Sequence, residues 1–444
     1  MRSYERKKHV KYALAIDIGA SSGRHIVGYK TDGGIMTDEI YRFPNGMDEV
    51  DGHLVWDVDR LFNEIKEGIK LAIKKYPTLS SVSIDTWGVD YVLLKGEEEV
   101  RPAFAYRDAR MDESIPEVHK IIPFEELYSM TGIQFNKFNT VYQLYSDKMM
   151  GRLEGVTDFL MLPEYFMYKL TGNKVKEFTE GSTGGFVNPD TRQINPEVFE
   201  RLALPAALVA PLYQPGTSAG CFKPEIAAEL GGSLEVILCA THDTGSAVEA
   251  IEMADNSPYI SSGTWSLLGV KTERAITDEK SRLSDYSNEG GVGYNRYQKN
   301  ITGMWIIQSL RKEMCPDKSY PDIADEAEAS DYAETFNVND DAFMAPKSMK
   351  EAVYGYLKAA GKPTPEKECD YFNAAYHSLA LGYKVAIDDL ENNTGKTYPG
   401  IYIVGGGAKN VYLNALTERY TGKKVYALPI EATAIGNLKI QLDK

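Results

Sequence analysis

Cysteine is scarce in this chain. Its 444 residues include only four, and no two of them form a C-x-x-C pair. They stand far apart, at Cys221, Cys239, Cys315 and Cys369. This spacing argues against a zinc site and against a disulfide framework. It is typical of a reducing compartment, so we expect a cytoplasmic protein.

Long apolar runs and excess basic charge are also missing. The N-terminal stretch MRSYERKKHVKYALAIDIG is basic, but its apolar part is short and is interrupted at Asp17. We therefore expect neither a signal peptide nor a membrane span. The net charge of −15 offers no footprint for nucleic acid and would repel an anionic membrane. An anionic ligand must then be held by local donors and a metal ion.

The chain is long enough for two domains, because 444 residues exceed what one hydrophobic core usually serves. Runs rich in β-forming residues predict strands over 13–18, 25–30 and 35–43, and apolar spacing predicts a helix over 58–76. Further helices are predicted over 304–314 and 371–391. A second α/β unit is expected to begin near residue 234, which divides the chain into domains 1–233 and 234–444.

Each half contains a hairpin with small and hydroxyl residues at its bend, DIGASSGR in the first half and SSGTWS in the second. The similarity suggests a duplicated fold that closes on one ligand. DIGASSGR is neither a Walker A loop nor a G-x-G-x-x-G fingerprint. Its small residues let backbone N–H groups approach phosphate, and Asp17 is suited to a hydrated Mg²⁺. Taken alone, however, DIGASSGR is better interpreted as a tight hairpin with a solvated aspartate, and a hydroxyl-rich β-turn explains SSGTWS at least as well as a phosphate site.

The stretch EVILCATHDTGSAVEAI places an acid at the end of an apolar strand. Asp243 is a candidate general base there, and the competing interpretation is that Asp243 or Thr244 caps the helix expected over 245–253. In VGGGAKN the glycines leave a surface without side chains, against which an adenine or a ribose could lie. The competing interpretation is that they allow a strand and a helix to pack closely. Together, two phosphate-type hairpins, a ledge and an acid favour phosphoryl transfer to a hydroxyl group.

Several longer sequence strings resemble those of a known protein family. The chain contains AIDIGASSGR, GHLVWDVDRL, SIDTWGVDYVLL, AYRDAR, TGIQFNKFNTVYQL, LMLPEYFMYKLTG, THDTGSAV, YISSGTWSLLG, NEGG, KNITGMWIIQ, YIVGGGAKN and EATAIGN. In this order the strings resemble the FGGY carbohydrate kinases, which belong to the actin-like and hexokinase-like ATPases. The resemblance implies an α/β fold with two ribonuclease H-like domains and a cleft for nucleotide and sugar between them. IDTWGVD and HDT separate this chain from glycerol and xylulose kinases.

The resemblance also implies roles for individual residues. The residues that would contact ATP are Ala20, Ser21, Ser22, Gly23, Arg24, Thr264, Asn300, Gln308 and Gly406, and Asp17 would lie near the Mg²⁺. The residues that would hold the ketose are Gly88, His242, Asp243 and Thr244. Asp243 would act as the catalytic base toward the C1 hydroxyl of the sugar.

Other expectations concern the surroundings of the site and the partners. Trp87 and Trp265 are expected as walls of the pocket. A structural ion network is expected around the sugar pocket from Asp85, Asp90, Asp108 and Arg110. Family members usually continue beyond the AIGN helix, so the second domain is expected to be short at its C-terminus and the chain could be weakened in turnover.

The expected partners are ATP and a small ketose, with no nucleic acid or membrane, in a monomer or homodimer. L-Rhamnulose is the first expectation for the ketose, and L-fuculose or a pentulose is the alternative. The alternative from another class is a nucleotide-switched binding protein of the actin or Hsp70 type.

Overall fold

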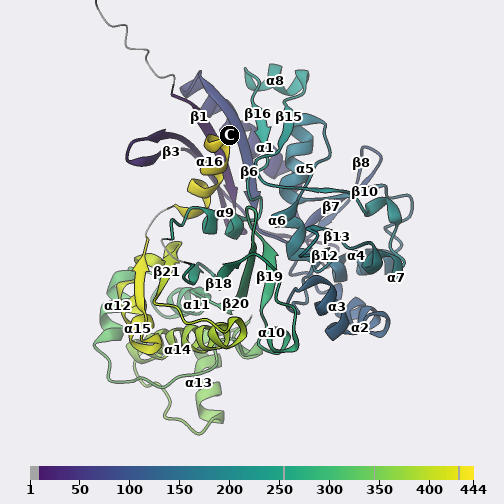
Figure 1. Ribbon diagram of the computed structural model, residues 1–444. Helices are drawn as coiled ribbons and strands as arrows, with labels where there is room; N and C mark the ends of the chain where they lie inside the picture. Colours follow the sequence, from purple (N-terminus) through teal and green to yellow (C-terminus); the bar gives the residue numbers. More distant parts are fainter. Residues whose placement is uncertain (1–9, 254–255, 345, 429–430) are drawn as a thin grey trace, which may run out of the picture.

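Two mixed sheets, each covered by helices, make up the protein (Figure 1). The computed structural model describes residues 10–253, 256–344, 346–428 and 431–444. The first sheet has the strand order β15-β16-β6-β1-β2-β3. Its strands are β1 (Tyr12–Ile18), β2 (Ser22–Thr31), β3 (Gly34–Pro44), β6 (Leu79–Thr86), β15 (Ser218–Cys221) and β16 (Glu235–Ile237). The strands predicted over 13–18, 25–30 and 35–43 are therefore confirmed.

The second sheet repeats the topology of the first. Its strands are β17 (Tyr259–Ser262), β18 (Trp265–Thr272), β19 (Ser287–Gly290), β20 (Asn295–Thr302), β21 (Gly400–Val404) and β22 (Lys424–Ala427). In each sheet three antiparallel strands lead into two parallel ones, as β3-β2-β1-β6-β16 and as β20-β18-β17-β21-β22. The duplication predicted from the two hairpins is confirmed.

Helices cover both sheets and the flank of the first half. In the first half they are α1 (Val58–Lys75), α2 (Met111–Ile121), α3 (Phe124–Thr131), α4 (Thr140–Met149), α5 (Leu162–Thr171), α6 (Phe178–Gly181), α7 (Pro196–Arg201), α8 (Pro224–Leu230) and α9 (Asp243–Glu249). Those that follow are α10 (Glu279–Leu283), α11 (Trp305–Met314), α12 (Tyr320–Glu328), α13 (Met349–Ala359), α14 (Glu368–Thr394), α15 (Val411–Thr421) and α16 (Ala432–Asp443). The helices predicted over 58–76, 304–314 and 371–391 correspond to α1, α11 and α14.

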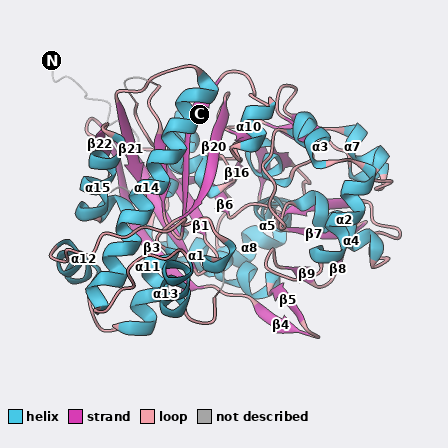
Figure 2. Ribbon diagram, turned by 90° about the horizontal axis from the view of Figure 1, so that it is seen from below, coloured by secondary structure: helices cyan, strands magenta, loops and turns pink. Residues whose placement is uncertain are grey.

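Small sheets complete the first half. The short strands are β4 (Asp48–Val50), β5 (His53–Trp56), β7 (Tyr91–Lys95), β8 (Glu98–Val100), β9 (Ala103–Phe104), β10 (Asp158–Met161), β11 (Lys176–Glu177), β12 (Val187–Asn188), β13 (Gln193–Ile194) and β14 (Leu212–Tyr213). In Figure 2 the strands β7, β8 and β9 lie on the side opposite the cluster formed by α11 to α15.

The alternation of β1 explains which helix covers which face of the first sheet. Leu14, Ile16 and Ile18 pack in one core with α1, whereas Ala13 and Ala15 pack with α16 on the other face. Because alanine is small, α16 comes close to the sheet. A helix from the end of the sequence thus closes the first sheet.

The helices α9 and α16 form a layer between the two sheets (Figure 1). In α9, Ala247 and Val248 pack with Tyr259 and Val404 of the second sheet. The two helices cross closely at Gly436 of α16, where an added Cβ would lie 1.8 Å from the carbonyl oxygen of Ser246. The position of α9, which begins at Asp243, therefore depends on α16.

Sheet membership bears on the domain division expected at residue 234. β16 follows that residue, yet it pairs in parallel with β6 of the first sheet.

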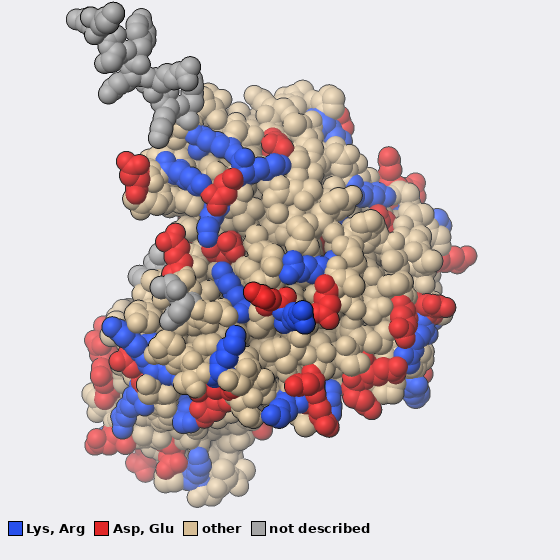
Figure 3. Space-filling view, in the orientation of Figure 1, with Lys and Arg blue, Asp and Glu red and all other residues tan. Residues whose placement is uncertain are grey.

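Among the residues that the structure describes, no helix is both long and apolar enough to cross a membrane. Lysine and arginine are interspersed with aspartate and glutamate over the face shown in Figure 3.

Candidate active site

A cavity of about 760 Å³ lies between the two halves of the molecule. From the first half it is lined by the β1–β2 turn, by residues 87–89 after β6 and by the start of α9. From the second half it is lined by the β17–β18 turn, by Asn300 of β20 and by Trp305 and Gln308 of α11. Strand ends and turns from both halves therefore face one space, as a two-substrate site requires.

The β1–β2 turn is closed by backbone hydrogen bonds. The Gly19 N–H donates to the Ser22 carbonyl at 2.9 Å, and Asn45 donates from its side chain to the Gly19 carbonyl at 2.9 Å. Ala20 and Ser21 at the bend line the cavity. Arg24, already in β2, turns to Asp17 and donates two hydrogen bonds to its Oδ2, at 2.9 and 2.8 Å.

Asp17 and Asp85 are two buried carboxylates on neighbouring parallel strands. They face each other in the register of β1 and β6. Burial raises the pKa of Asp17, and this effect outweighs the opposing charge of Arg24. Burial also raises the pKa of Asp85 well above its usual range, and the nearby Asp17 carboxylate adds to the rise. Asp85 accepts a 2.5 Å hydrogen bond from Asn437, but its Oδ1 is buried with no partner within the described ranges.

The segment His242 to Thr244 follows β16, which ends at Ile237, and lies beside the end of β6. The Thr86 N–H donates to the Thr241 carbonyl at 2.9 Å, which fixes this backbone beside β6. His242 then occupies the N-cap position of α9, with no hydrogen bond from its side chain to the helix. The interpretation of Asp243 or Thr244 as the capping residue is wrong, and the helix predicted over 245–253 instead spans Asp243–Glu249.

Asp243 is the accessible acid of the cavity. Its side chain is 33% exposed, and the Thr244 hydroxyl donates to its Oδ1 at 3.1 Å. Its Oδ1 also lies 3.5 Å from Nε2 of His242. A carboxylate with one neighbouring hydroxyl and open space beside it can accept a proton from a bound hydroxyl group.

His242 connects the two halves of the molecule. Its Nδ1 lies 2.9 Å from a guanidinium nitrogen of Arg296 and 3.2 Å from Oε2 of Glu289, and both partners belong to the second half. Arg296 is fully buried and also donates to Glu289 at 3.1 Å. Burial alone would raise the pKa of Glu289, but the Arg296 charge and the contact with His242 outweigh it and lower that pKa to about 2.

The triple glycine divides into two kinds of position. Gly405 has a φ of +85°, and an added Cβ at Gly407 would lie 1.9 Å from the Ser262 hydroxyl. These two glycines permit a turn and a close approach to the β17–β18 hairpin. An added Cβ at Gly406 would meet nothing within 4 Å, so this position alone of the three faces open space. Asn410 then opens α15, where its side chain caps the N–H of Leu413.

The cavity brings together most of the predicted site residues. Those that line it are Ala20, Ser21, Gly88, His242, Asp243, Thr244, Thr264, Asn300 and Gln308. Those that do not are Asp17, Ser22, Gly23, Arg24 and Gly406. Asn300 points to a ligand in a further way, because its Oδ1 is buried and has no hydrogen-bond partner among the residues that the structure describes. Trp87 and Trp265 line the cavity, as expected of walls.

Sequence reasoning missed several polar lining residues, namely Arg107, Asn136, Asn139, Thr183 and Glu289. Three strings that supported the resemblance contain four of them, AYRDAR, TGIQFNKFNTVYQL and NEGG. The signal was present, but nothing in one sequence separates a lining residue from a buried one. Gly88 is a related case: a Cβ there would lie 2.9 Å from the Thr183 hydroxyl, which accepts a bond from the N–H of Val89.

The structure divides the ion network expected around the sugar pocket. Asp85 lies against α16, bound to Asn437. Arg110 does pair with Asp108, at 4.0 Å, and it pairs more closely with Asp147, at 3.2 Å. Asp90 instead accepts hydrogen bonds from two indoles, Trp56 at 2.7 Å and Trp87 at 2.9 Å. Asp90 thus holds a wall of the cavity.

The repeated sheets and the cavity between them define a two-domain α/β enzyme of the actin-like ATPase fold. Two family models match, the N-terminal domain of the FGGY family of carbohydrate kinases over residues 12–248 and its C-terminal domain over residues 258–442. The chain belongs to the FGGY family of carbohydrate kinases. Family membership decides for a kinase against a nucleotide-switched binding protein.

Curated relatives match over nearly the whole chain. Rhamnulokinase from Oceanobacillus iheyensis is 41% identical over 433 residues, which cover 97% of this chain and 92% of the relative. Rhamnulokinase from Bacillus subtilis is 40% identical over 438 residues, covering 96% and 89%.

Solved structures share the fold at low identity. Xylulose kinase from Lactobacillus acidophilus superimposes with a TM-score of 0.79 at 15% identity, covering 97% of this chain and 88% of that one. Glycerol kinase from Plasmodium falciparum, solved with ADP, gives 0.73 at 13% identity, covering 97% and 89%.

Proposed function

We propose that this protein transfers the γ-phosphoryl group of ATP to the C1 hydroxyl of L-rhamnulose and so forms L-rhamnulose 1-phosphate. Rhamnulokinases at 35–41% identity over nearly the full chain support this choice of sugar. The observation that carries the proposal is the placement of Asp243: its accessible carboxylate shares one cavity with the β17–β18 turn of the opposite half.

The sugar lies at the first half in this proposal, between Gly88 and the segment His242 to Thr244. Gly88 keeps the wall free of a side chain, and the polar groups of His242 and Thr244 bond the sugar hydroxyls. Asp243 accepts the proton of the C1 hydroxyl as the oxygen attacks the γ-phosphorus. Of the three neighbouring acids Asp17, Asp85 and Asp243, only Asp243 lines the cavity, which supports its role as the base.

The nucleotide lies toward the second half. We assign its phosphates to the β1–β2 turn at Ala20 and Ser21 and to the β17–β18 turn at Thr264. Backbone N–H groups and hydroxyls at such turns stabilise phosphate oxygens. Asn300, Gln308 and the open position at Gly406 hold the rest of the nucleotide. Ser22, Gly23 and Arg24 lie outside the cavity and act by shaping the first turn.

The acid pair fits a Mg²⁺ ion that accompanies ATP. Burial raises the pKa of both carboxylates, and the Asp17 charge adds to the rise at Asp85. Asp85 Oδ1 is also buried with no hydrogen-bond partner among the described residues, so a nearby cation would stabilise both carboxylates. No group of three acidic, histidine or cysteine side chains within the described ranges is arranged to hold a metal. This agrees with magnesium chemistry, because the ion keeps several waters and takes one or two carboxylates plus phosphate oxygens. When bound, the ion neutralises charge on the phosphates.

We place the division between the two domains after α9 rather than at residue 234. The pairing of β16 with β6 supports this, as does the N-terminal family model, which ends at residue 248. The catalytic acid then belongs to the first domain, at the surface that faces the second. Closure of the two domains would exclude water from the γ-phosphate and so limit ATP hydrolysis.

The test is ADP production measured by a coupled assay with ATP and Mg²⁺. The acceptors are L-rhamnulose, L-fuculose, L-xylulose and D-xylulose, with a blank that contains no sugar. We expect turnover chiefly with L-rhamnulose and little ADP in the blank. Preference for another ketose would change the proposed substrate but leave the proposed kinase activity in place. Turnover independent of sugar, or no turnover with ATP bound, would overturn the proposal.

A further inference from the structure

Phosphoryl transfer needs positive charge at the transferred group, and Arg24 is poorly placed to supply it. Its guanidinium forms ion pairs with Asp17 and Glu431. It does not line the cavity. An arginine already neutralised by two carboxylates offers little net charge to a phosphate.

Arg107 is the single arginine or lysine among the described residues that line the cavity. It follows β9 in the first half, and its side chain is without a carboxylate partner in the described part of the chain. Within the described ranges the side chain makes one hydrogen bond, which Nε donates to the Tyr106 hydroxyl at 3.1 Å. The remaining contacts are aromatic, since the guanidinium lies 5.5 Å from the ring centre of Tyr106 and 5.9 Å from that of Trp305.

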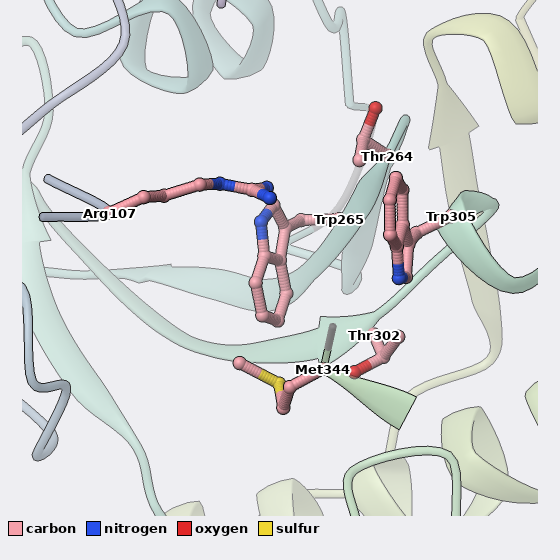
Figure 4. A pocket seen from close by; sticks show the side chains of 6 residues that line it. All are labelled: Arg107, Thr264, Trp265, Thr302, Trp305 and Met344. Atoms are coloured by element: carbon pink, nitrogen blue, oxygen red, sulfur yellow. The ribbon is translucent and has the colours of Figure 1, made fainter. Parts of the chain in front are cut away.

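The side chain of Arg107 reaches across to the second half. Figure 4 shows it extended toward the indole of Trp265, with Thr264 and Trp305 beyond. These residues line a small crevice that adjoins the main cavity, and Arg107, Thr264, Trp265 and Trp305 line both. An uncompensated cation from the first half therefore lies beside the β17–β18 turn, which is the assigned phosphate turn of the second half.

We propose that Arg107 is a further catalytic residue, whose guanidinium binds the phosphoryl group during its transfer. This inference rests on the proposed function. In the step, the C1 oxygen of the sugar forms a bond to the γ-phosphorus, and the bond from that phosphorus to the β–γ bridging oxygen breaks. The bonding electrons leave with ADP, and the hydroxyl proton goes to Asp243. Arg107 donates N–H groups to the oxygens of the transferred group and stabilises their charge.

The contacts of Arg107 suit such a role. A guanidinium presents a planar fork of donors that matches two phosphoryl oxygens. Cation–π contacts at accessible sites contribute only about 0.5–1 kcal/mol, so they hold the arginine ready without binding it tightly. Charged hydrogen bonds to a phosphoryl group would readily replace them.

The test compares Arg107→Met, Arg107→Lys and a control, Arg274→Met, in the full chain. Arg274 is exposed and lies outside the cavity lining. We expect Arg107→Met to lower kcat about 10²–10³-fold while the KM values change less than about threefold. Arg107→Lys should recover part of the loss, and added guanidinium should partly rescue Arg107→Met. Arg274→Met should behave as wild type.

A second readout separates catalysis from folding or sugar binding. Binding of MgADP with aluminium fluoride and the sugar should weaken in Arg107→Met by a factor similar to the loss of kcat, while the melting temperature and ATP binding stay unchanged. An unchanged kcat, or a higher KM for the sugar with kcat intact, would overturn the inference. If wild type prefers another ketose, the same comparison with that ketose tests Arg107 independently of the sugar assignment.

Discussion

Single residues in this site differ mainly in their access to the cavity. The Asp17 side chain is 11% exposed and Asp85 is fully buried, whereas the Asp243 side chain is 33% exposed. A base must touch the hydroxyl that it deprotonates, so burial separates the acids suited to a cation from the acid suited to the proton.

Replacing Asp243 by asparagine tests its role as the base. An amide of the same shape keeps the contacts but cannot accept the proton, so we expect kcat to fall by roughly 10²–10⁴. ATP affinity, measured by calorimetry, should stay within about threefold. Near-normal turnover would remove Asp243 from the role of base.

Asp90 acts on the cavity wall. Burial raises its pKa to about 6, against the opposing hydrogen bonds from Trp87 and Trp56. Its Oδ2 accepts from both indoles, and its Oδ1 accepts from the amide of Gln143 at 3.2 Å. In Asp90→Asn the new amide nitrogen must face one of these donors. We expect a loss of about 1–3 kcal/mol in unfolding free energy, measured with urea, and a higher KM for the sugar. Wild-type stability and KM would show that the wall does not depend on this carboxylate.

Among the elements, α9 and α16 matter most for the site. The first carries Asp243 at its start, and the second packs on β1 and β6 and holds Asp85 through Asn437. Their close crossing at Gly436 leaves no room for a side chain. The helix that ends the described chain therefore positions an acid placed almost two hundred residues earlier.

Adding one methyl group at this crossing should disturb the site. In Gly436→Ala the new Cβ would lie 1.8 Å from the Ser246 carbonyl oxygen, so the helices must separate. We expect a loss of about 1–3 kcal/mol in unfolding free energy and a marked fall in kcat. The control is Gly355→Ala in α13, where an added Cβ meets nothing within 4 Å. The control should match or slightly exceed wild-type stability. Equal behaviour of the two variants would contradict the crossing argument.

At the scale of the whole molecule, buried charges join the two halves beside the cavity. His242 comes from the first half, and Glu289 and Arg296 from the second. Arg296 is fully buried, so its charge depends on partners within the protein. Its single carboxylate partner among the described residues is Glu289.

Removing that carboxylate should destabilise the protein in a pH-dependent way. Glu289→Gln leaves the Arg296 charge buried without compensation, and we expect a cost of about 3–5 kcal/mol at neutral pH. The folded pKa of Glu289, about 2, lies below the usual 4.5. Between these values the unfolded chain binds more protons than the folded one, so this contribution to stability is lost as pH falls through the window. Unfolding measured from pH 7 downward should show a weaker decline for Glu289→Gln than for wild type. If the stability of the two proteins fell in parallel with pH, the lowered pKa of Glu289 would be refuted.

Local pattern was enough to identify much of the fold. Alternation along β1 to β3, the spacing of apolar residues in α1 and the two similar hairpins predicted the strands, the helix and the duplication. These features follow from neighbours close in sequence, whose side chains must alternate or recur at the period of the element. The strings around Gly88, His242 and Thr264 likewise pointed to the residues that share the cavity.

Folding decided what distant segments do to each other. Arg24 and Asp17 form an ion pair because β1 and β2 place them opposite one another. Arg24 was expected to contact the phosphates of ATP, but its charge is neutralised by this pairing. Arg107 looks like any surface arginine in its own string, and only the meeting of the two halves places it beside Thr264. β16 belongs to the first sheet because it pairs in parallel with β6, a strand that lies far earlier in the chain. Charge and residue type are local properties, but access, pairing and net charge at a point depend on packing between segments far apart in sequence.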